Sequence, residues 1–140
     1  MKYVPPKKIA HIGIAVHSIK KTLPFYTNHL GLELERMEDV ISEQVKIAFL
    51  KIGETRIELL EPLNESSAIY KFLQKKGEGI HHLAFEVENL SSRLKKLKED
   101  GIQLINEKPK KGANNSLIGF IHPRSTSGVL IELCEHHKKG

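Results

Sequence analysis

The sequence repeats itself once at a spacing of about 70 residues, and this repeat limits the folds that the chain can adopt. The matched segments are AHIGIAV (10–16) with HHLAFEV (81–87), LGLEL (30–34) with DGIQL (100–104), and TRIELLEP (55–62) with GVLIELCE (128–135). The offset is 71 from His11 to His82, 70 from Gly31 to Gly101 and 74 from Glu58 to Glu132. A nearly constant offset over three segments indicates two copies of one structural module.

Each copy is predicted to form a strand, a helix and three further strands. In the first copy, residues 8–17 have apolar side chains at both parities, as a buried strand does. The following helix should end at Gly31, and we place its regular start near Thr22, because a proline as deep as Pro24 clashes with the preceding turn. The remaining strands are predicted at 32–38, 44–51 and 55–61.

The second copy has the same predicted order. A strand at 80–87 leads to a helix from Asn89 to Asp100, which Asn89 should cap and Gly101 should close. Further strands are expected at 102–107, 116–122 and 128–135, with a loop over 108–115, and the connector between the copies should hold a short helix from about Ser67 to Lys76.

One module is too small to bury its own sheet, so we expect the two to pack as one domain spanning residues 1–140. Its parts are module one (about 8–61), a connector (about 62–79) and module two (about 80–135). The predicted fold class is α+β, with the two β-α-β-β-β modules forming one mixed-sheet, barrel-like cleft.

Charge and composition narrow the possible partners. The chain has 22 basic and 17 acidic residues, a formal net charge of +5, which favours ligands that carry phosphate. The basic residues are scattered and aromatic residues make up only 6%, with no tryptophan, so nucleic acid is not expected as a partner. No apolar run is long enough to span a membrane, and the N-terminus lacks the apolar core of a signal peptide. With a single cysteine, Cys134, these features predict a cytoplasmic protein that does not bind membranes.

Two polar positions are kept through the repeat. His11 and His82 occupy the same place in the first strand of each module, and Glu58 and Glu132 the same place in the last strand. A carboxylate between aliphatic neighbours either faces solvent or is buried beside a partner or a metal. Two imidazoles and two carboxylates suit a borderline divalent metal with positions left open for water or substrate.

Longer segments extend the match to a known family. HIGIAV, FYTNHLGLE, VKIAFLKIGETRIELLEPL, SAIYKFLQKKGEGIHHLAFEVENL and IGFIHPRSTSGVLIEL resemble the vicinal-oxygen-chelate superfamily, which includes glyoxalase I, ring-cleaving dioxygenases and antibiotic-resistance proteins. Within it the chain is similar to the methylmalonyl-CoA epimerases, for which the connector motif KFLQKKGEGIHHLAFEV is fairly specific.

This resemblance implies a metal-dependent epimerase that removes the α-proton of methylmalonyl-CoA and returns it to the opposite face. The implied ligands of one divalent metal per chain are His11, Glu58, His82 and Glu132, with cobalt favoured and zinc, manganese or nickel as alternatives. Glu132 and Glu58 are the implied acid–base groups, and a homodimer is implied by analogy. Loop position and net charge make Lys110, Lys111 and Arg124 the candidates for contact with the coenzyme A phosphates.

One position departs from the epimerase pattern. Some bacterial epimerases carry a catalytic glutamate in the third strand together with glutamine at the position of Glu58, whereas this chain has Ile47 with Glu58. The resulting His-Glu-His-Glu set is like that of glyoxalase I. A lactoylglutathione lyase is therefore the alternative enzyme, and a metal-free drug-binding protein or an iron dioxygenase fits the four retained residues less well.

Overall fold

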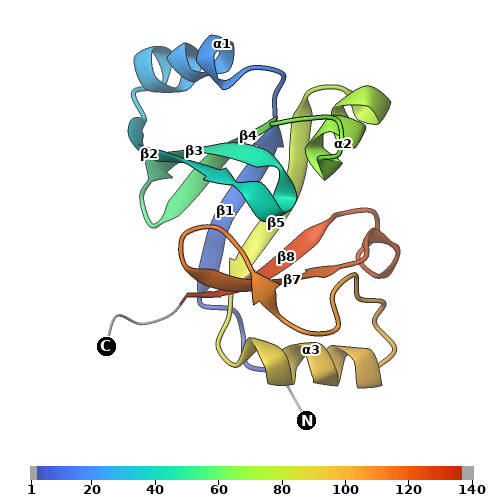
Figure 1. Ribbon diagram of the computed structural model, residues 1–140. Helices are drawn as coiled ribbons and strands as arrows, with labels where there is room; N and C mark the ends of the chain where they lie inside the picture. The colour runs from blue at the N-terminus through green and yellow to red at the C-terminus, as the bar shows by residue number, and fades with distance from the viewer. Residues whose placement is uncertain (1–2, 137–140) are drawn as a thin grey trace. The chain divides into compact units, whose positions relative to one another are not determined.

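The computed structural model describes residues 3–136, which divide into two compact units (Figure 1). One unit runs from His11 to His81, and the other combines residues 3–10 with residues 82–136. Both contain helices and strands, so the predicted α+β class is confirmed. The boundaries of the two units fall within the first predicted strand of each module, between residues 10 and 11 and between residues 81 and 82. The barrel-like cleft expected between the two modules stays a prediction.

The first module has strand order β2-β3-β4-β1, with β1 parallel to β4 and the other pairs antiparallel. Its strands are β1 (Lys8–Ala15), β2 (Glu33–Val40), β3 (Val45–Ile52) and β4 (Thr55–Pro62). Its helical elements are α1 (Ile19–Pro24), the π-helical turn η1 (Phe25–His29) and the 3-10 turn η2 (Ile41–Glu43), and the segment that follows the module holds α2 (Ala68–Lys76). The helix α2 lies in the connector, close to its predicted span.

The second module repeats this order as β5-β8-β7-β6, again with its first and last strands parallel. Its elements are β5 (Gly79–Glu86), α3 (Leu90–Glu99), β6 (Lys110–Lys111), β7 (Ser116–Ile121), the 3-10 turn η3 (Pro123–Ser125) and β8 (Ile131–His136). The matching strand order confirms that the sequence repeat is a repeat of structure.

Each module buries one face of its sheet under one helix. Val16, Ala48 and Leu59 form a core with Ile19 at the start of α1, and the corresponding core in module two packs Leu133 against Leu94 of α3. Figure 1 shows α1 and α3 lying beside the strands of their own modules. Since side chains alternate between the faces of a sheet, polar residues such as Glu58 and Glu132 point to the face opposite these cores.

A glutamate from the last strand of each module holds the start of that module's helix. The backbone N–H of Ile19 donates to Glu61 Oε1 at 2.7 Å, and that of Leu90 donates to Glu135 Oε1 at 3.1 Å. Free N–H groups and the helix dipole at a helix N-terminus favour a carboxylate there. Glu61 and Glu135 are therefore repeat-related caps. The predicted capping by Asn89 is wrong, because its side chain makes no capping bond and its own N–H also donates to Glu135.

Two predicted boundaries are also wrong. The helix α1 starts at Ile19 rather than Thr22, because the Ser18 hydroxyl accepts from the Lys21 N–H and opens the helix earlier. Pro24 then ends α1, and the chain continues as the π-helical turn η1. The strand predicted at 102–107 is reduced to one bridge between Leu104 and Ile121, while the two-residue strand β6 lies inside the predicted loop.

Glu135→Ala is expected to destabilise the protein by about 1 kcal/mol, the usual cost of losing a helix cap. The reason is that two backbone N–H groups at the start of α3 lose their acceptor. Chemical denaturation at neutral pH measures this loss. Glu88→Ala is the control, since Glu88 only pairs with Lys7 at the exposed surface and such pairs contribute little. Equal stability of the two variants would contradict the capping role.

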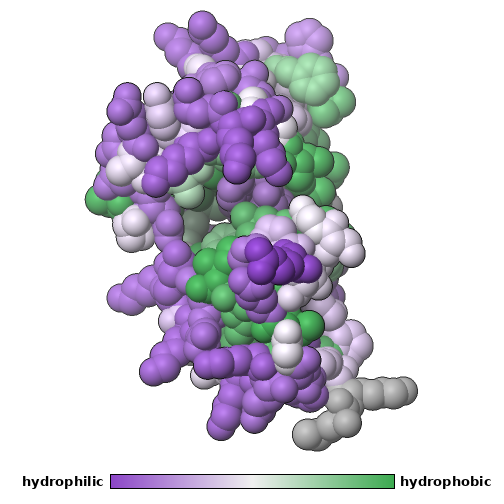
Figure 2. Space-filling model, turned by 90° about the vertical axis from the view of Figure 1, so that its right-hand side faces the viewer, coloured by the Kyte–Doolittle hydropathy of each residue, from purple (hydrophilic) through white to green (hydrophobic). Residues whose placement is uncertain are grey.

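Within residues 3–136, none of the helices is both long enough and apolar enough to cross a membrane. The face displayed in Figure 2 is largely hydrophilic, with hydrophobic side chains in smaller areas between.

Candidate functional site

The first module holds a histidine and a glutamate side by side on the sheet face opposite its helix. Parallel pairing of β1 with β4 sets Gly13 beside Glu58 and His11 beside Arg56, so His11 and Glu58 share that face. His11 Nδ1 lies 3.0 Å from Glu58 Oε2. Glu58 is buried and His11 is nearly so.

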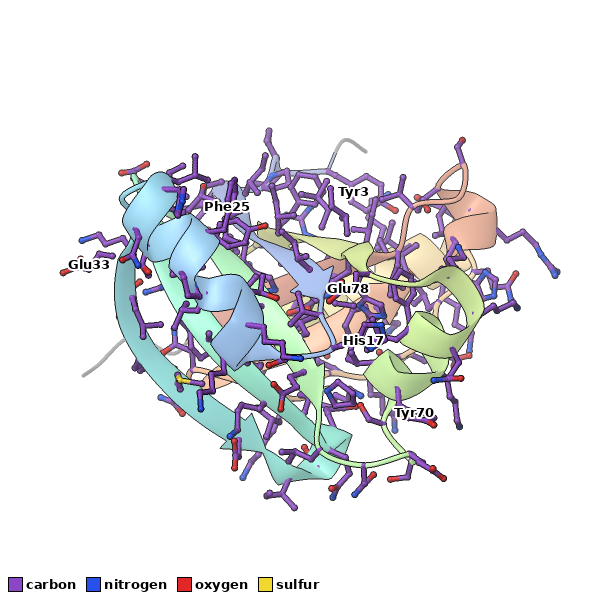
Figure 3. The ribbon with its side chains drawn as sticks, turned by 90° about the horizontal axis from the view of Figure 1, so that it is seen from above. Tyr3, His17, Phe25, Glu33, Tyr70 and Glu78 are labelled. Carbon is purple, nitrogen blue, oxygen red and sulfur yellow. The ribbon has the colours of Figure 1, made fainter. Side chains whose placement is uncertain are left out.

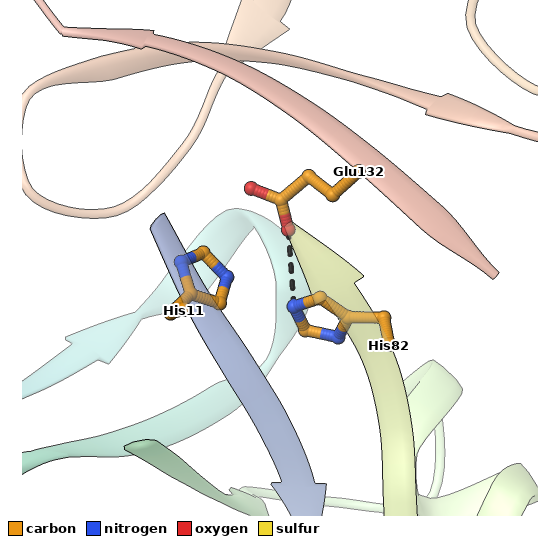
Figure 4. Close-up of side chains that lie close together, drawn as sticks. All are labelled: His11, His82 and Glu132. Atoms are coloured by element: carbon orange, nitrogen blue, oxygen red, sulfur yellow. Dashed lines mark ion pairs between the residues drawn. The ribbon is translucent and has the colours of Figure 1, made fainter. Parts of the chain in front are cut away.

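The second module holds the equivalent pair. His82 Nε2 lies 3.1 Å from Glu132 Oε1, and each residue is only 6% exposed (Figure 4). The strands β5 and β8 that carry them correspond to β1 and β4 of the first module. The same two residue types therefore meet on the same two strands in both copies.

Burial of these four side chains is costly, and the cost argues for a function. A buried carboxylate or imidazolium loses its hydration, and the attraction within a pair only partly offsets this loss. Apolar residues at the same positions would stabilise the fold as well or better. The repeat nevertheless keeps Glu58 and Glu132 buried, each beside a histidine. This pattern is typical of a ligand set or an acid–base site.

Sequence reasoning missed two phenylalanines that lie beside these pairs. Phe49 is the direct partner of Glu58 across β3 and β4, and Phe120 is the direct partner of Glu132 across β7 and β8. The ring of Phe120 also meets the His82 ring edge-on, with centroids 5.7 Å apart. Extending the repeat by one more segment would have found them, since IAF at 47–49 and IGF at 118–120 are 71 residues apart.

The neighbouring histidine, His81, lies on the other side of β5 from His82. Its ring packs edge-on against Phe72 of α2, with centroids 4.9 Å apart. Nearby, the backbone N–H of His17 donates to the Glu78 carboxylate at 2.9 Å, and Figure 3 labels both residues close to α2. The ring of His81 therefore has surroundings distinct from those of His82.

The three basic residues predicted to meet coenzyme A do not form one group. Lys110 pairs with Ile118 and Lys111 with Leu117, so the two lysines face opposite sides of the sheet. Only Lys110 shares the face of Glu132, since Ile118 is on that face. Arg124 is exposed in η3, where its backbone N–H donates to His122 Nδ1. Contact between these residues and a ligand stays a prediction.

Comparisons with known proteins agree with this architecture. The sequence model described as "Glyoxalase/Bleomycin resistance protein/Dioxygenase superfamily" matches residues 10–120. An uncharacterized Bacillus subtilis protein is 48% identical, with 91% of both chains covered. Human mitochondrial methylmalonyl-CoA epimerase is 37% identical, over 90% of this chain and 72% of that protein. The structure of a Streptomyces coelicolor methylmalonyl-CoA epimerase variant in complex with 2-nitronate-propionyl-CoA is 36% identical, covers 94% of this chain and 96% of that one, and has a TM-score of 0.90.

Proposed function

Since the chain belongs to the Glyoxalase/Bleomycin resistance protein/Dioxygenase superfamily, we propose that it epimerises methylmalonyl-CoA or a closely similar acyl-CoA. The observation that carries this proposal is the pair of buried His–Glu contacts on equivalent strands of the two modules. The resemblance to the human epimerase supports the substrate class, as does the coenzyme A ligand of the Streptomyces relative. A homodimer and the cytoplasmic location stay predictions.

The proposal includes one divalent metal ion held by His11, Glu58, His82 and Glu132. The chemistry of this donor set fits a metal, because two neutral imidazoles and two carboxylates are common ligands of zinc, cobalt, nickel and manganese. Each module presents one imidazole next to one carboxylate, so the modules supply equal halves of the set. When bound, the metal would supply electrostatic stabilisation for negative charge that develops on the thioester oxygen.

The protein's own residues would move the proton. Epimerisation needs a base on one face of the α-carbon and an acid on the other, or one group that reaches both. We assign these roles to Glu132 and Glu58, because they come from opposite modules at equivalent positions. The apolar neighbours Phe49 and Phe120 would exclude water while substrate is bound, which strengthens electrostatic effects at the site.

A lactoylglutathione lyase is the second candidate, and one observation favours it. Ile47 is buried on the face of Glu58, so the third strand supplies no carboxylate there. The acid–base groups are then the two glutamates of a glyoxalase I-like set, which would also serve proton transfer in a glutathione hemithioacetal. The two enzymes would differ in their substrates more than in their proton carriers.

An assay of both reactions at matched metal content distinguishes them. Metal-loaded protein is incubated in deuterated water with methylmalonyl-CoA, and separately with methylglyoxal and glutathione. We expect α-deuterium uptake and loss of optical activity with the thioester, and slower turnover of the glutathione adduct. Added salt should weaken binding of the thioester, because it screens exposed charges that meet phosphate. Faster turnover of the glutathione adduct would overturn the epimerase proposal in favour of the lyase.

A further inference from the structure

A row of directly paired residues crosses the first module at the level of Glu58. Gly13 of β1, Glu58 of β4, Phe49 of β3 and Arg36 of β2 are direct neighbours across successive strands. Direct partners in a sheet point to the same face. Arg36 therefore lies on the face of Glu58, two strands away, which corresponds to about 10 Å between the backbones.

The side chain of Arg36 lies over this row. Its guanidinium carbon is 4.2 Å from the centre of the Phe49 ring, within the range of a cation–π contact. Phe49 belongs to the strand between β2 and β4, so stacking on it brings the guanidinium from the edge strand toward Glu58. Stacking also fixes the plane of the guanidinium, which orients its N–H groups for a planar anion.

A carboxylate already binds this guanidinium within the same strand. Arg36 Nη1 lies 2.7 Å from Glu38 Oε1, and both side chains are partly exposed at 41% and 31%. Glu38 thus holds the guanidinium in a carboxylate-binding arrangement and also competes with an incoming acid.

Another arginine on this face has a different arrangement. Arg56, beside His11 in the register, donates through Nε to Glu35 Oε1 at 2.8 Å, and this hydrogen bond holds the pKa of Glu35 below its ordinary value. Arg56 belongs to the row of His11 rather than to that of Glu58. Arg36 is therefore the arginine in the row of the proposed proton carrier.

We propose that Arg36 determines substrate specificity by binding the free carboxylate of the acyl group, an inference that rests on the proposed function. The malonyl-type acid carries its carboxylate on the same carbon that loses the proton, so a guanidinium on the face of Glu58 would meet this carboxylate beside the proton carrier and the proposed metal. Guanidinium is suited to this role because it binds a carboxylate through two parallel hydrogen bonds. Acyl-CoA molecules that lack the carboxylate would gain nothing from Arg36.

The test compares two thioesters that differ in that one group. Binding of methylmalonyl-CoA and of propionyl-CoA to the metal-loaded protein is measured by calorimetry for the wild type, Arg36→Met, Arg36→Lys and Glu38→Gln. Arg36→Met should raise the Kd of methylmalonyl-CoA by about 10- to 100-fold, the usual effect of a lost charge-assisted hydrogen bond, and leave that of propionyl-CoA unchanged. Arg36→Lys should recover part of the affinity. Glu38→Gln should lower the Kd of methylmalonyl-CoA, because it removes the competing carboxylate.

Lys98→Met is the matched control for net charge, since Lys98 forms an exposed pair with Glu107 on the other module. It should leave both affinities unchanged. Equal weakening of the two thioesters by Arg36→Met would overturn the carboxylate assignment and indicate contact with coenzyme A phosphate. Wild-type affinity in Arg36→Met would overturn the inference while leaving the proposed function intact. A wild-type protein that binds neither thioester would overturn both.

Discussion

Glu58→Gln is expected to lower the rate of epimerisation by about 10²–10⁴-fold, the contribution of one positioned acid or base, while metal content stays near that of the wild type. The amide oxygen of glutamine can still coordinate a metal, but the amide cannot carry the proton. The measurements are α-deuterium uptake by methylmalonyl-CoA in deuterated water and the amount of metal bound per chain. Near-normal activity would mean that Glu58 acts only as a ligand.

The matched control is Glu61→Gln in the same strand. It makes the same chemical change three residues away, where Glu61 accepts from the N–H of Ile19 on the opposite face. It should lower stability slightly and leave turnover per folded protein unchanged. Adding Ile47→Glu to the Glu58→Gln variant places a new carboxylate on the site face, on the strand that pairs with β4. We expect this double variant to recover part of the lost rate.

His82→Ala is expected to remove most of the metal, from about one ion per chain to a small fraction of that. The substitution deletes one imidazole of the proposed set and leaves Glu132 buried without its present partner. Titration of the metal-free protein with cobalt or zinc, followed by calorimetry, measures the affinity. His82→Ala should also lower stability without metal, so folding is checked by circular dichroism before each titration.

His81→Ala is the control for this experiment, because the two histidines are adjacent and differ only in the face that they occupy. His81 packs on Phe72, so its loss should reduce stability modestly and leave metal binding unchanged. Equal loss of metal from both variants would show that the effect comes from the fold rather than from a ligand. No loss from either would show that His82 is not a ligand.

Most features of the fold that can be predicted from the sequence follow from the internal repeat. Because an offset near 71 relates whole modules, it predicts equal element order, and both modules indeed place their last strand beside their first. Adjacent residues of a strand point to opposite faces of the sheet, so the sequence alone predicts that His81 and His82 lie on different faces of β5. The two His–Glu contacts follow from these two rules, since β1 pairs with β4 and β5 with β8.

The remaining features depend on tertiary contacts that local patterns do not contain. Asn89 is a good capping residue by type, yet Glu135 from a distant strand takes that role. The segment 102–107 has strand-like alternation but forms one isolated bridge at Leu104, with backbone hydrogen bonds at Gln103 and Ile105 on either side of it. The last strand in the order is instead β6, formed by Lys110 and Lys111. The role of Arg36 depends on its stacking over Phe49, and neither charge nor spacing along the chain indicates that contact.

The position of Arg36 on β2 has a consequence for aggregation. The strand β2 ends the sheet order, so one of its edges has backbone groups that no strand in that order covers. Five of its eight residues are charged, which discourages pairing with the edge of another molecule. Arg36, the proposed substrate-binding residue, is one of these charges. Variants that neutralise several of them should form β-rich aggregates at lower protein concentration than the wild type, even where each module remains folded.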